Sequence, residues 1–546
     1  MPHASTPDSR LAALLGQLAA LAADADADAD AAAYTTPAPD AGADRDLSLT
    51  DVLAQLPPGD VARSMQPAVL ERLRETAKKT QTLLDEQHLP REFRKQPAWW
   101  DGRRGPPEEK TRVILDDLIA LATECWDKDT PLASVVLTDC RFDEDESQRL
   151  RRVLGHCTAL TRLDLSGGQI DWSAIPDTAA FDSPSLAHLD LSRCELDLRE
   201  LAEVLRQWQC TDLAFLDLSH NRHQRDNPHS HPPRVFPRGD AHAALLAHVT
   251  RLARLNLAEN FIGDDQARAL TPFLISNTRL THLDLSLNKM SDFGARFVAK
   301  ALSTSSVLTH LNLSSNPIEP NGFRGLAADL ANIHNLTHLS LAYCRLCSPW
   351  GETRTGPSYL ARMLRTCTAL QSIDLEGNNV LPDGARALAG VLATCSALQD
   401  LNLNRNDVQF QGVAYLAPVF PQCKALRSLA LNGNDIQDIR DLLACLPSCA
   451  RLARLDLAYN SIASEAACQL ATIMPQCSAL CSLNLRGNRV EASAAHTLLD
   501  ALLTQRARPF TLNLLYNAFW NDEATHARLA QKCAGTNVRV ESRRDG

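Results

Sequence analysis

Apolar and polar residues change their period halfway through the segment DGARALAGVLATCSALQDLNLNRNDV. In its first half, Ala385, Leu388 and Leu392 recur at the three- and four-residue spacings that place side chains on one face of a helix. In its second half, Leu401 and Leu403 alternate with polar residues, which is the pattern of a half-buried strand. The segment therefore predicts one helix followed by one strand.

The strand half of this unit recurs along most of the chain. Fourteen copies of the string Leu-x-x-Leu-x-Leu-x-x-Asn, some with another residue in the final place, lie between about residue 132 and residue 519. Most of the spacings between copies are 26 to 29 residues, and the other two are 34 and 39. We call the final place the asparagine position; it holds Cys140, Gly168, Cys194, Asn221, Asn260, Asn288, Asn316, Cys344, Asn378, Asn406, Asn434, Asn460, Asn488 and Asn517.

A period in the twenties with this leucine pattern is the signature of a leucine-rich repeat solenoid. We therefore predict an α/β fold in the shape of a curved horseshoe, with about fourteen repeats of roughly 28 residues. One unit alone is not stable, because each buried apolar side chain contributes about 1.5–3 kcal/mol while each ordered residue costs about 1–2 kcal/mol. Stacked units bury both of their flanks, so the strands should form a parallel concave sheet and the helices the convex side.

Composition and pattern divide the chain into four predicted segments. Residues 1–45 form an Ala/Asp/Pro-rich leader that we expect to be disordered. Residues 46–130 are expected to be helical and to cap the first repeat, residues 131–533 hold the repeats, and residues 534–546 form a short tail. Within the leader, RLAALLGQLAALAA fits either the apolar part of a signal peptide or a short amphipathic helix in an uncleaved export segment.

Cysteines occupy two repeating positions. Three hold the asparagine position, and seven lie three residues before the first leucine of their repeats: Cys157, Cys210, Cys367, Cys395, Cys423, Cys449 and Cys477. Other repeats place Val249, Ser305 or Ile333 there, so the position favours a small and mostly apolar side chain. Free cysteine packs as such a residue. We expect these cysteines to be buried packing residues in a protein that works in a reducing compartment.

The motifs of the repeat resemble a known subfamily. The Cys-x-x-Leu before the strand, the 28-residue period and the helix motif Asp-x-Gly-Ala-x-x-Leu-Ala-x-x-Leu resemble ribonuclease-inhibitor-like leucine-rich repeats over about 70% of the chain. The helices DGARALAGVL (383–392) and DFGARFVAKAL (292–302) are also similar to those of GALA proteins, which are bacterial type III effectors. The resemblance implies a virulence protein that is secreted into the cytoplasm of a host cell; the alternative is a cytoplasmic protein of its own cell.

Charge and hydropathy narrow the classes of partner. The net charge is −10, but residues 1–50 carry −6 of it, so the rest of the chain is close to neutral. Phosphate binding depends on a basic face, and we therefore expect no nucleic-acid partner. No stretch approaches the roughly 20 consecutive apolar residues of a membrane span, so we expect no membrane partner either.

Motifs of catalysis and cofactor binding do not occur in the sequence. Phosphate-binding, dinucleotide-binding, nucleophile-elbow and zinc-protease motifs are absent, so we predict no enzyme, no catalytic residue, no cofactor and no small-molecule substrate. Cys125-Trp126-Asp127 shares the Cys-x-Asp spelling of one class of effector ubiquitin ligase, without the large catalytic domain of that class. The histidines of 220–239 and the pair Cys344 and Cys347 lack a tetrahedral ligand set, so we predict no metal site.

Three functions are compatible with the sequence. The first is a non-enzymatic scaffold for protein–protein interaction, which the repeats support directly. The second is a ubiquitin-ligase adaptor, because residues 46–65 resemble the middle of an F-box and would recruit a Skp-type adaptor. The third is a Ran-type GTPase-activating protein, a class that normally ends in an acidic tail, whereas this chain ends VRVESRRDG.

The concave face carries the candidate binding residues. On each strand, two polar positions alternate with the buried leucines, so each position forms a column of side chains across the sheet. The inner column is mostly Asp and Asn, as is common in the subfamily, and holds little information about a partner. We name the other column the histidine column; it contains Arg162, His188, Phe215, Arg254, His282, His310 and His338. Its last three members should stack at about 4.7–4.9 Å and lower one another's affinity for protons.

Tyrosines at the strand ends form a second candidate surface. Tyr343, Tyr459 and Tyr516 each lie next to the asparagine position of a repeat. Tyrosine and arginine are enriched at the centres of protein interfaces. We therefore predict partner binding by Phe215, Arg254, His282, His310, His338, Tyr343 and Tyr459.

Overall fold

The computed structural model describes the second of two units of the chain, Pro90–Gly546, over much of its length. The described residues are 91–95, 115, 117–122, 132–155, 157–170, 185–194, 212–221, 246, 249, 251–347, 355–504 and 509–542. The predicted leader, the F-box-like segment, the Cys125-Trp126-Asp127 triplet and most of the histidine-containing insertion therefore lie outside the described residues.

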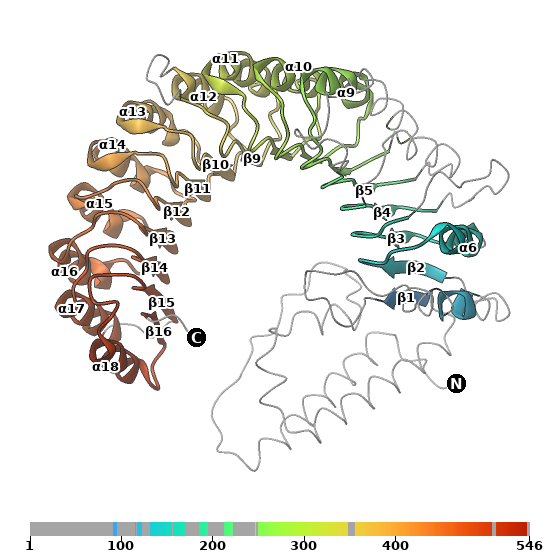
Figure 1. Cartoon of the computed structure of the whole chain (residues 1–546). Helices are drawn as coiled ribbons and strands as arrows, with labels where there is room; N and C mark the ends of the chain where they lie inside the picture. The colour runs from blue at the N-terminus through green and yellow to red at the C-terminus, as the bar shows by residue number, and fades with distance from the viewer. Residues whose placement is uncertain are drawn as a thin grey trace, which may run out of the picture. The chain divides into compact units, whose positions relative to one another are not determined.

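One parallel sheet of sixteen strands runs through this unit, and its spatial order is the order of the sequence (Figure 1). The strands are β1 (Arg91–Lys95), β2 (Leu132–Leu137), β3 (Arg162–Asp164), β4 (His188–Asp190), β5 (Phe215–Asp217), β6 (Arg254–Asn256), β7 (His282–Asp284), β8 (His310–Asn312), β9 (His338–Ser340), β10 (Ser372–Asp374), β11 (Asp400–Asn402), β12 (Ser428–Ala430), β13 (Arg454–Asp456), β14 (Ser482–Asn484), β15 (Phe510–Asn513) and β16 (Val538–Glu541).

Helices lie on the outer side of the curve and strands on the inner side (Figure 1). The described α-helices are α6 (Glu144–Gly155), α9 (Asp264–Ser276), α10 (Asp292–Leu302), α11 (Glu319–Leu330), α12 (Gly356–Leu364), α13 (Leu381–Leu392), α14 (Gln409–Leu416), α15 (Arg440–Cys445), α16 (Ser464–Ile473), α17 (Ala492–Leu503) and α18 (Glu523–Cys533). Short 3-10 segments, η2 (Ala417–Gln422), η3 (Leu446–Ser448) and η4 (Met474–Gln476), follow three of them. None of the helices in the described residues has the length and apolar character needed to cross a membrane.

The core lies between the sheet and the helices, where the sequence pattern predicts it. Leu401 and Leu403 of one strand segment are 3% and 0% exposed, and Leu388 and Leu392 of α13 face them as buried residues. Matching leucines of neighbouring strands are register partners, for example Leu401 with Leu429. The predicted leucine-rich repeat solenoid is therefore confirmed, and β2 to β15 correspond to the fourteen predicted repeats.

The sheet is longer at both ends than we predicted. Strand β1 lies inside the segment 46–130 that we expected to be helical, and it pairs with β2. Strand β16 lies inside the predicted tail 534–546, and it pairs with β15. Neither strand carries the leucine string. Each end strand is held by backbone hydrogen bonds to a single neighbouring strand, so it does not need the full set of leucines that an inner repeat buries. Residues 117–122 are helical as expected, and Leu118 is buried.

Buried asparagines connect each repeat to the next. The Asn406 side chain is fully buried; its Oδ1 accepts hydrogen bonds from the backbone N–H of Asn378 (3.0 Å) and Val380 (3.2 Å). Its Nδ2 donates to the carbonyl oxygens of Leu375 (2.8 Å) and Asn404 (2.9 Å). One amide thus pairs four backbone groups at the strand end, which water cannot reach.

Cysteines at the two repeating positions are buried, as predicted, except Cys449, which is half-buried, and Cys210, which lies outside the described residues. At the asparagine position the thiol keeps part of the amide's role, because the Cys344 Sγ donates to the carbonyl of Leu313 (3.2 Å). Burial raises the pKa of Cys344 to about 12 and that of Cys367 to about 11, so these thiols stay protonated near neutral pH. All fourteen cysteines that the structure describes are free.

Candidate functional site

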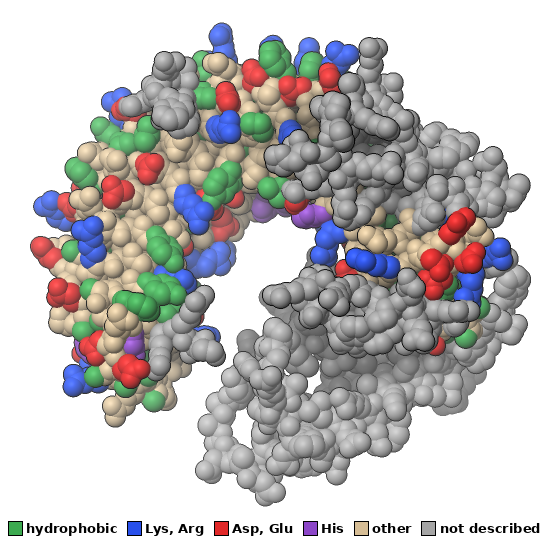
Figure 2. Space-filling view, in the orientation of Figure 1, with side chains coloured by type: hydrophobic (Ala, Val, Ile, Leu, Met, Phe, Trp, Pro, Cys, Tyr) green, Lys and Arg blue, Asp and Glu red, His purple; other side chains and the backbone are tan. Residues whose placement is uncertain are grey.

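Histidine side chains lie on the inner face of the curve (Figure 2). Three members of the histidine column stack on one another. His282, His310 and His338 lie on β7, β8 and β9 and are register partners. The ring centroids of the first pair are 3.9 Å apart and those of the second 4.1 Å, with interplanar angles of 13° and 8°. The rings are therefore closer than the predicted strand spacing and lie almost parallel.

Burial is the main cause of the shifted histidine pKa values. Burial, together with the smaller effect of the positive charges of His282, His338 and Arg254, lowers the pKa of His310 to about 4. Burial and the Arg254 charge also lower the pKa of His282. We predicted mutual repulsion as the cause; it contributes, but the loss of solvent is larger.

The first part of the same column has a different character. His188 and Phe215 stack with their ring centroids 4.0 Å apart and an interplanar angle of 3°. Burial, with a smaller effect of the Arg162 charge, lowers the pKa of His188 to about 4. Arg254 on β6 separates this pair from the three stacked histidines and is exposed.

The inner Asp/Asn column supports the strand ends. The Oδ1 of Asp284 accepts a hydrogen bond from the backbone N–H of Ser286 (2.8 Å), two residues further on. Its Oδ2 accepts a hydrogen bond from the Nδ2 of Asn312 in the next repeat (2.9 Å). Equivalent bonds recur along the sheet, for example from Glu376 N–H to Asp374 (3.1 Å). This column thus has a structural role in every repeat where these bonds form.

The tyrosines occupy a strained backbone position. The residue before the asparagine position has a positive φ in all fourteen repeats: Asp139, Gly167, Arg193, His220, Glu259, Leu287, Ser315, Tyr343, Gly377, Arg405, Gly433, Tyr459, Gly487 and Tyr516. This left-handed conformation lets the N–H reach the following repeat, as in the bonds from Tyr343 to the Glu376 carbonyl (2.7 Å) and from Tyr459 to the Arg486 carbonyl (2.6 Å). A non-glycine residue in this conformation costs about 1–2 kcal/mol. The side chain at this position is therefore carried on a backbone that both repeats hold in place.

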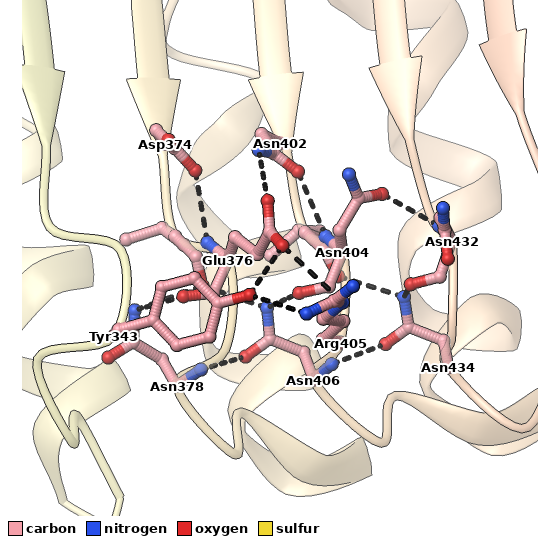
Figure 3. Close-up of polar contacts among 12 residues, drawn as sticks. Tyr343, Asp374, Glu376, Asn378, Asn402, Asn404, Arg405, Asn406, Asn432 and Asn434 are labelled. Atoms are coloured by element: carbon pink, nitrogen blue, oxygen red, sulfur yellow. Dashed lines mark hydrogen bonds and ion pairs between the residues drawn. The ribbon is translucent and has the colours of Figure 1, made fainter. Parts of the chain in front are cut away.

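Tyr343 is held by a polar cluster at the end of β9 (Figure 3). Its hydroxyl donates to the Oε1 of Glu376 (2.6 Å) and accepts from the Nη1 of Arg405 (3.1 Å). The Arg405 Nε lies 3.6 Å from the same carboxylate oxygen. The ring lies over Gly377, where an added Cβ would be 2.4 Å from its Cδ1. Burial and the Glu376 hydrogen bond raise the pKa of Tyr343, so the hydroxyl keeps its proton.

Tyr459 repeats this arrangement four strands further along. Its ring lies over Gly487, and its hydroxyl accepts a hydrogen bond from the Nε of Arg486 (2.7 Å). The Arg486 guanidinium is 5.5 Å from the Tyr459 ring centroid and 4.7 Å from that of Tyr516. Tyr516 in turn contacts Trp520, with ring centroids 5.8 Å apart. We name Tyr343, Glu376, Arg405, Tyr459, Arg486, Tyr516 and Trp520 the strand-end surface.

The seven predicted binding residues fall into two groups. Phe215, Arg254, His282, His310 and His338 lie side by side on β5 to β9, and Tyr343 follows β9 directly. Tyr459 follows β13 and lies apart from them. Sequence reasoning did not find Glu376, Arg405 and Arg486; the available signal was the recurrence of glycine at 167, 377, 433 and 487, which marks the left-handed position. A role of these residues in binding stays a prediction.

The histidine and cysteine residues that we considered as metal ligands make other contacts where the structure describes them. Among the described residues, no group of three or more His, Cys, Asp and Glu side chains could hold a metal ion. Cys344 and Cys347 are both buried in the core. The Nδ1 of His220 lies 2.7 Å from the Oε2 of Glu259.

The fold defines a leucine-rich repeat protein, and its architecture is consistent with a scaffold for protein–protein interaction. The family model "Leucine Rich repeat" matches residues 276–299, 304–327 and 366–389. A comparison with curated proteins finds no match.

Similar solved structures include an internalin from Listeria monocytogenes, which is 18% identical, with 72% of this chain and 82% of that chain covered and a TM-score of 0.36. The mouse RP105/MD-1 complex is 15% identical, with 75% and 70% covered and a TM-score of 0.37. Actin-binding site 2 of leiomodin-1 is 20% identical, with 27% and 79% covered and a TM-score of 0.22.

Proposed function

We propose that this protein is a non-enzymatic scaffold that binds a protein partner through the inner face, using the histidine column and the strand-end surface. The proposal is based on exposed tyrosine side chains that hydrogen bonds hold in one position. Tyr343 and Tyr459 are 41% and 49% exposed, yet each hydroxyl is fixed by a hydrogen bond to an arginine. Exposed aromatic and arginine side chains are the usual anchors of interfaces, and anchors that are already ordered lose little entropy on binding.

We further propose that the protein acts as a type III effector inside a host cell. The GALA-like helices and the Ala/Asp/Pro-rich leader support this proposal. The free, buried cysteines also support it, because a reducing cytoplasm keeps thiols in this state. The adaptor alternative would add residues 46–65 as a second binding segment, and binding of a Skp-type adaptor that is lost on deleting them would support it.

Affinity capture with matched variants tests the binding surface. The full-length protein, a His310→Ala/Tyr343→Ala double variant and an Arg386→Glu variant are immobilised and exposed to a host-cell extract. Arg386 lies on the outer helix α13 with a 63% exposed side chain and serves as the control. We expect a protein that is retained by the parent and by Arg386→Glu and is lost by the double variant.

Thermal unfolding checks that the double variant is folded, and its midpoint should lie within about 3 °C of the parent value because both side chains lie on the surface. A partner that is kept by the double variant and lost by Arg386→Glu would instead place binding on the outer face. The identified partner is then titrated by calorimetry against the same three proteins.

A further inference from the structure

Glu376 balances the polar cluster at Tyr343 (Figure 3). Its Oε1 accepts a hydrogen bond from the Tyr343 hydroxyl (2.6 Å), and the Nε of Arg405 lies 3.6 Å from the same oxygen. Arg405 also donates from its Nη1 to the Tyr343 hydroxyl (3.1 Å). One carboxylate of the chain itself therefore accepts from the tyrosine O–H and balances the arginine charge.

The same three places are filled differently four strands further along. Tyr459 again lies one residue before the asparagine position of its repeat. In the next repeat, Arg486 holds the place of Glu376, two residues before that position. In the repeat after it, Tyr516 holds the place of Arg405. The second cluster therefore has an arginine where the first cluster has a carboxylate.

This exchange leaves donors of the second cluster without an acceptor in the part of the chain that the structure describes. The Arg486 Nε donates to the Tyr459 hydroxyl (2.7 Å), so the hydroxyl still has its own proton to donate. No described group accepts that proton or a proton of the Arg486 Nη atoms, and no described carboxylate forms an ion pair with this guanidinium. An arginine side chain is always charged in proteins. The cluster thus offers one positive charge and one O–H donor to a partner.

The other charged groups of β13 and β16 have partners within the chain. Arg454 on β13 lies 3.1 Å from Asp400, and Arg539 on β16 lies 3.7 Å from Glu541. Asp456, at the end of β13, accepts a hydrogen bond from a backbone N–H at 2.9 Å. The positive charge of the second cluster is therefore the one that these groups do not balance.

We propose that Tyr459 and Arg486 bind the carboxylate of an aspartate or glutamate side chain of the partner protein, in the role that Glu376 has in the first cluster; the proposal rests on the proposed function. A carboxylate has two acceptor oxygens, so it can accept from the O–H and from the guanidinium together. A phosphate group carries a charge of about −1.5 to −2 at neutral pH. One unbalanced arginine matches the single charge of a carboxylate better.

Exposed aromatic surface beside this pair indicates which residues flank the acidic one. Trp520 is 55% exposed and contacts Tyr516. Asp522, two residues further on, accepts from the N–H (3.2 Å) and the hydroxyl (2.6 Å) of Thr525, so it is engaged at the start of α18. Aromatic side chains pack favourably on other aromatic rings. The expected ligand is therefore an acidic residue next to aromatic residues.

A defined peptide gives the first test. Acetyl-Gly-Phe-Glu-Phe-Gly-amide, whose one charge is the glutamate, is titrated into the 15N-labelled full chain, with the glutamine peptide as the matched control. The indole N–H signal of Trp520, assigned with Trp520→Phe, reports binding. We expect the glutamate peptide to bind about tenfold more tightly, because hydrogen bonds between charged groups are the stronger ones, and to weaken as salt is added.

Three results of this titration would overturn the proposal. They are equal affinity for the two peptides, no shift of the Trp520 signal at the highest soluble concentration, and tighter binding of the phosphoserine peptide Acetyl-Gly-Phe-pSer-Phe-Gly-amide. The last result would assign the site to a phosphate group.

Variants of the two donors give the second test. Arg486→Gln should bind the glutamate peptide about tenfold more weakly, and Tyr459→Phe about threefold to tenfold more weakly, since each loses a hydrogen bond to the carboxylate. Arg454→Gln removes an arginine that Asp400 already pairs with, and it should bind like the parent. Normal binding by Arg486→Gln, or an equal loss in Arg454→Gln, would contradict a specific carboxylate site.

A double variant can close the second cluster in the way that the first is closed. Arg486→Glu/Tyr516→Arg places a carboxylate and an arginine around Tyr459 as Glu376 and Arg405 lie around Tyr343. We expect this variant to lose the glutamate peptide, and circular dichroism checks that it is folded. If the folded variant still bound the peptide as the parent does, the carboxylate would not occupy the place that we assign to it.

The two proposals fail in different ways. If the glutamate peptide does not bind but the His310→Ala/Tyr343→Ala variant loses the captured partner, the carboxylate site is wrong and the scaffold is supported. If the peptide binds as expected but the double variant retains the partner, binding through His310 and Tyr343 is wrong and the carboxylate site is supported.

Discussion

At the residue scale, the asparagine position shows how a short side chain can join two repeats. Asn378, Asn406 and Asn434 lie in a line, and the backbone N–H of each of the first two donates to the next amide (Figure 3). The repeat string predicted that asparagine recurs at this position. It could not identify the hydrogen-bond partners of the amide, because those partners come from neighbouring repeats and from a turn that the leucine spacing does not describe.

Two substitutions of Asn406 should distinguish the contribution of the donating Nδ2 from that of the whole side-chain amide. Asn406→Ala leaves the buried N–H groups of Asn378 and Val380 without the amide oxygen and removes one hydrogen bond from each of two carbonyl groups, so we expect a loss of roughly 2–5 kcal/mol in the free energy of unfolding. Asn406→Cys should lose less, because a thiol can donate to the Leu375 carbonyl as Cys344 donates to Leu313. Urea titration of both variants measures the difference; equal losses would show that the thiol contact does not matter.

Neighbouring residues of β11 should differ sharply in their sensitivity. Leu401 is 3% exposed between stacked repeats, so Leu401→Ala should cost roughly 2–5 kcal/mol through the cavity that it leaves. Asp400 faces solvent and pairs with Arg454 at 3.1 Å, with both side chains substantially exposed. Asp400→Ala should therefore cost less than about 1 kcal/mol. Similar losses in denaturant titrations would contradict the observed strand register.

At the scale of single elements, the sequence predicted the columns better than the strand ends. Alternation within a strand and a constant period are enough to bring His282, His310 and His338 into register. The contact between Tyr343 and Arg405 joins residues 62 positions apart, because Gly377 between them has no side chain. Its geometry depends on a left-handed turn, and hydrophobic periodicity carries no information about such turns.

Acid should weaken the histidine stack. The pKa of His310 is about 4 in the folded chain, below its ordinary value of 6.5, so the unfolded chain binds the proton more readily between these values. Its contribution to stability is complete above pH 6.5 and falls as the pH drops towards 4. We expect His310→Gln to show a smaller drop in the thermal midpoint between pH 7 and pH 5 than the parent. His188, whose pKa is also about 4, keeps part of the dependence in both proteins.

Two glycine-to-alanine variants should have opposite effects. At Gly377 the backbone φ is +66° and a Cβ would overlap the Tyr343 ring, so Gly377→Ala should destabilise by at least about 1–2 kcal/mol. At Gly390, inside helix α13, no atom lies within 4 Å of an added Cβ. Gly390→Ala should therefore stabilise by about 0.5–1 kcal/mol. Differential scanning calorimetry compares the two, and a loss in both would argue against a specific contact at Gly377.

At the scale of the whole described unit, the repeat period was sufficient to predict the architecture and the number of inner strands. The strands at either end escaped prediction because each has a neighbour on one side only and needs no complete leucine string. β16 shows this directly: Val538 is buried, while Arg539 and Glu541 remain partly or fully exposed. The edge of the sheet is thus completed by a segment with a weak hydrophobic signal.

Removal of that segment should change how the molecule behaves in solution. Deleting residues 534–546 removes the pairing of β16 with β15 and the hydrogen bond from Asn513 to Glu541 (2.8 Å). The freed edge of β15 can pair with another chain, so we expect a lower thermal midpoint and self-association that increases with concentration. Sedimentation velocity measures the association, with a chain lacking only residues 543–546 as the control. A monomeric truncated chain of unchanged stability would show that β16 does not protect the edge.

The pairing of each strand with its neighbours in the sequence also determines how such a chain responds to mechanical force. The strand-end hydrogen bonds join each repeat to its neighbours, as the bond from Tyr343 to Glu376 does, and among the described strands none pairs with one further away. Tension applied at one end therefore loads the outermost interface first and leaves the interior intact. Each repeat of 28 residues that comes free lengthens the chain by about 90–100 Å. The solenoid would therefore extend under load in steps, and each step would correspond to the unfolding of one repeat.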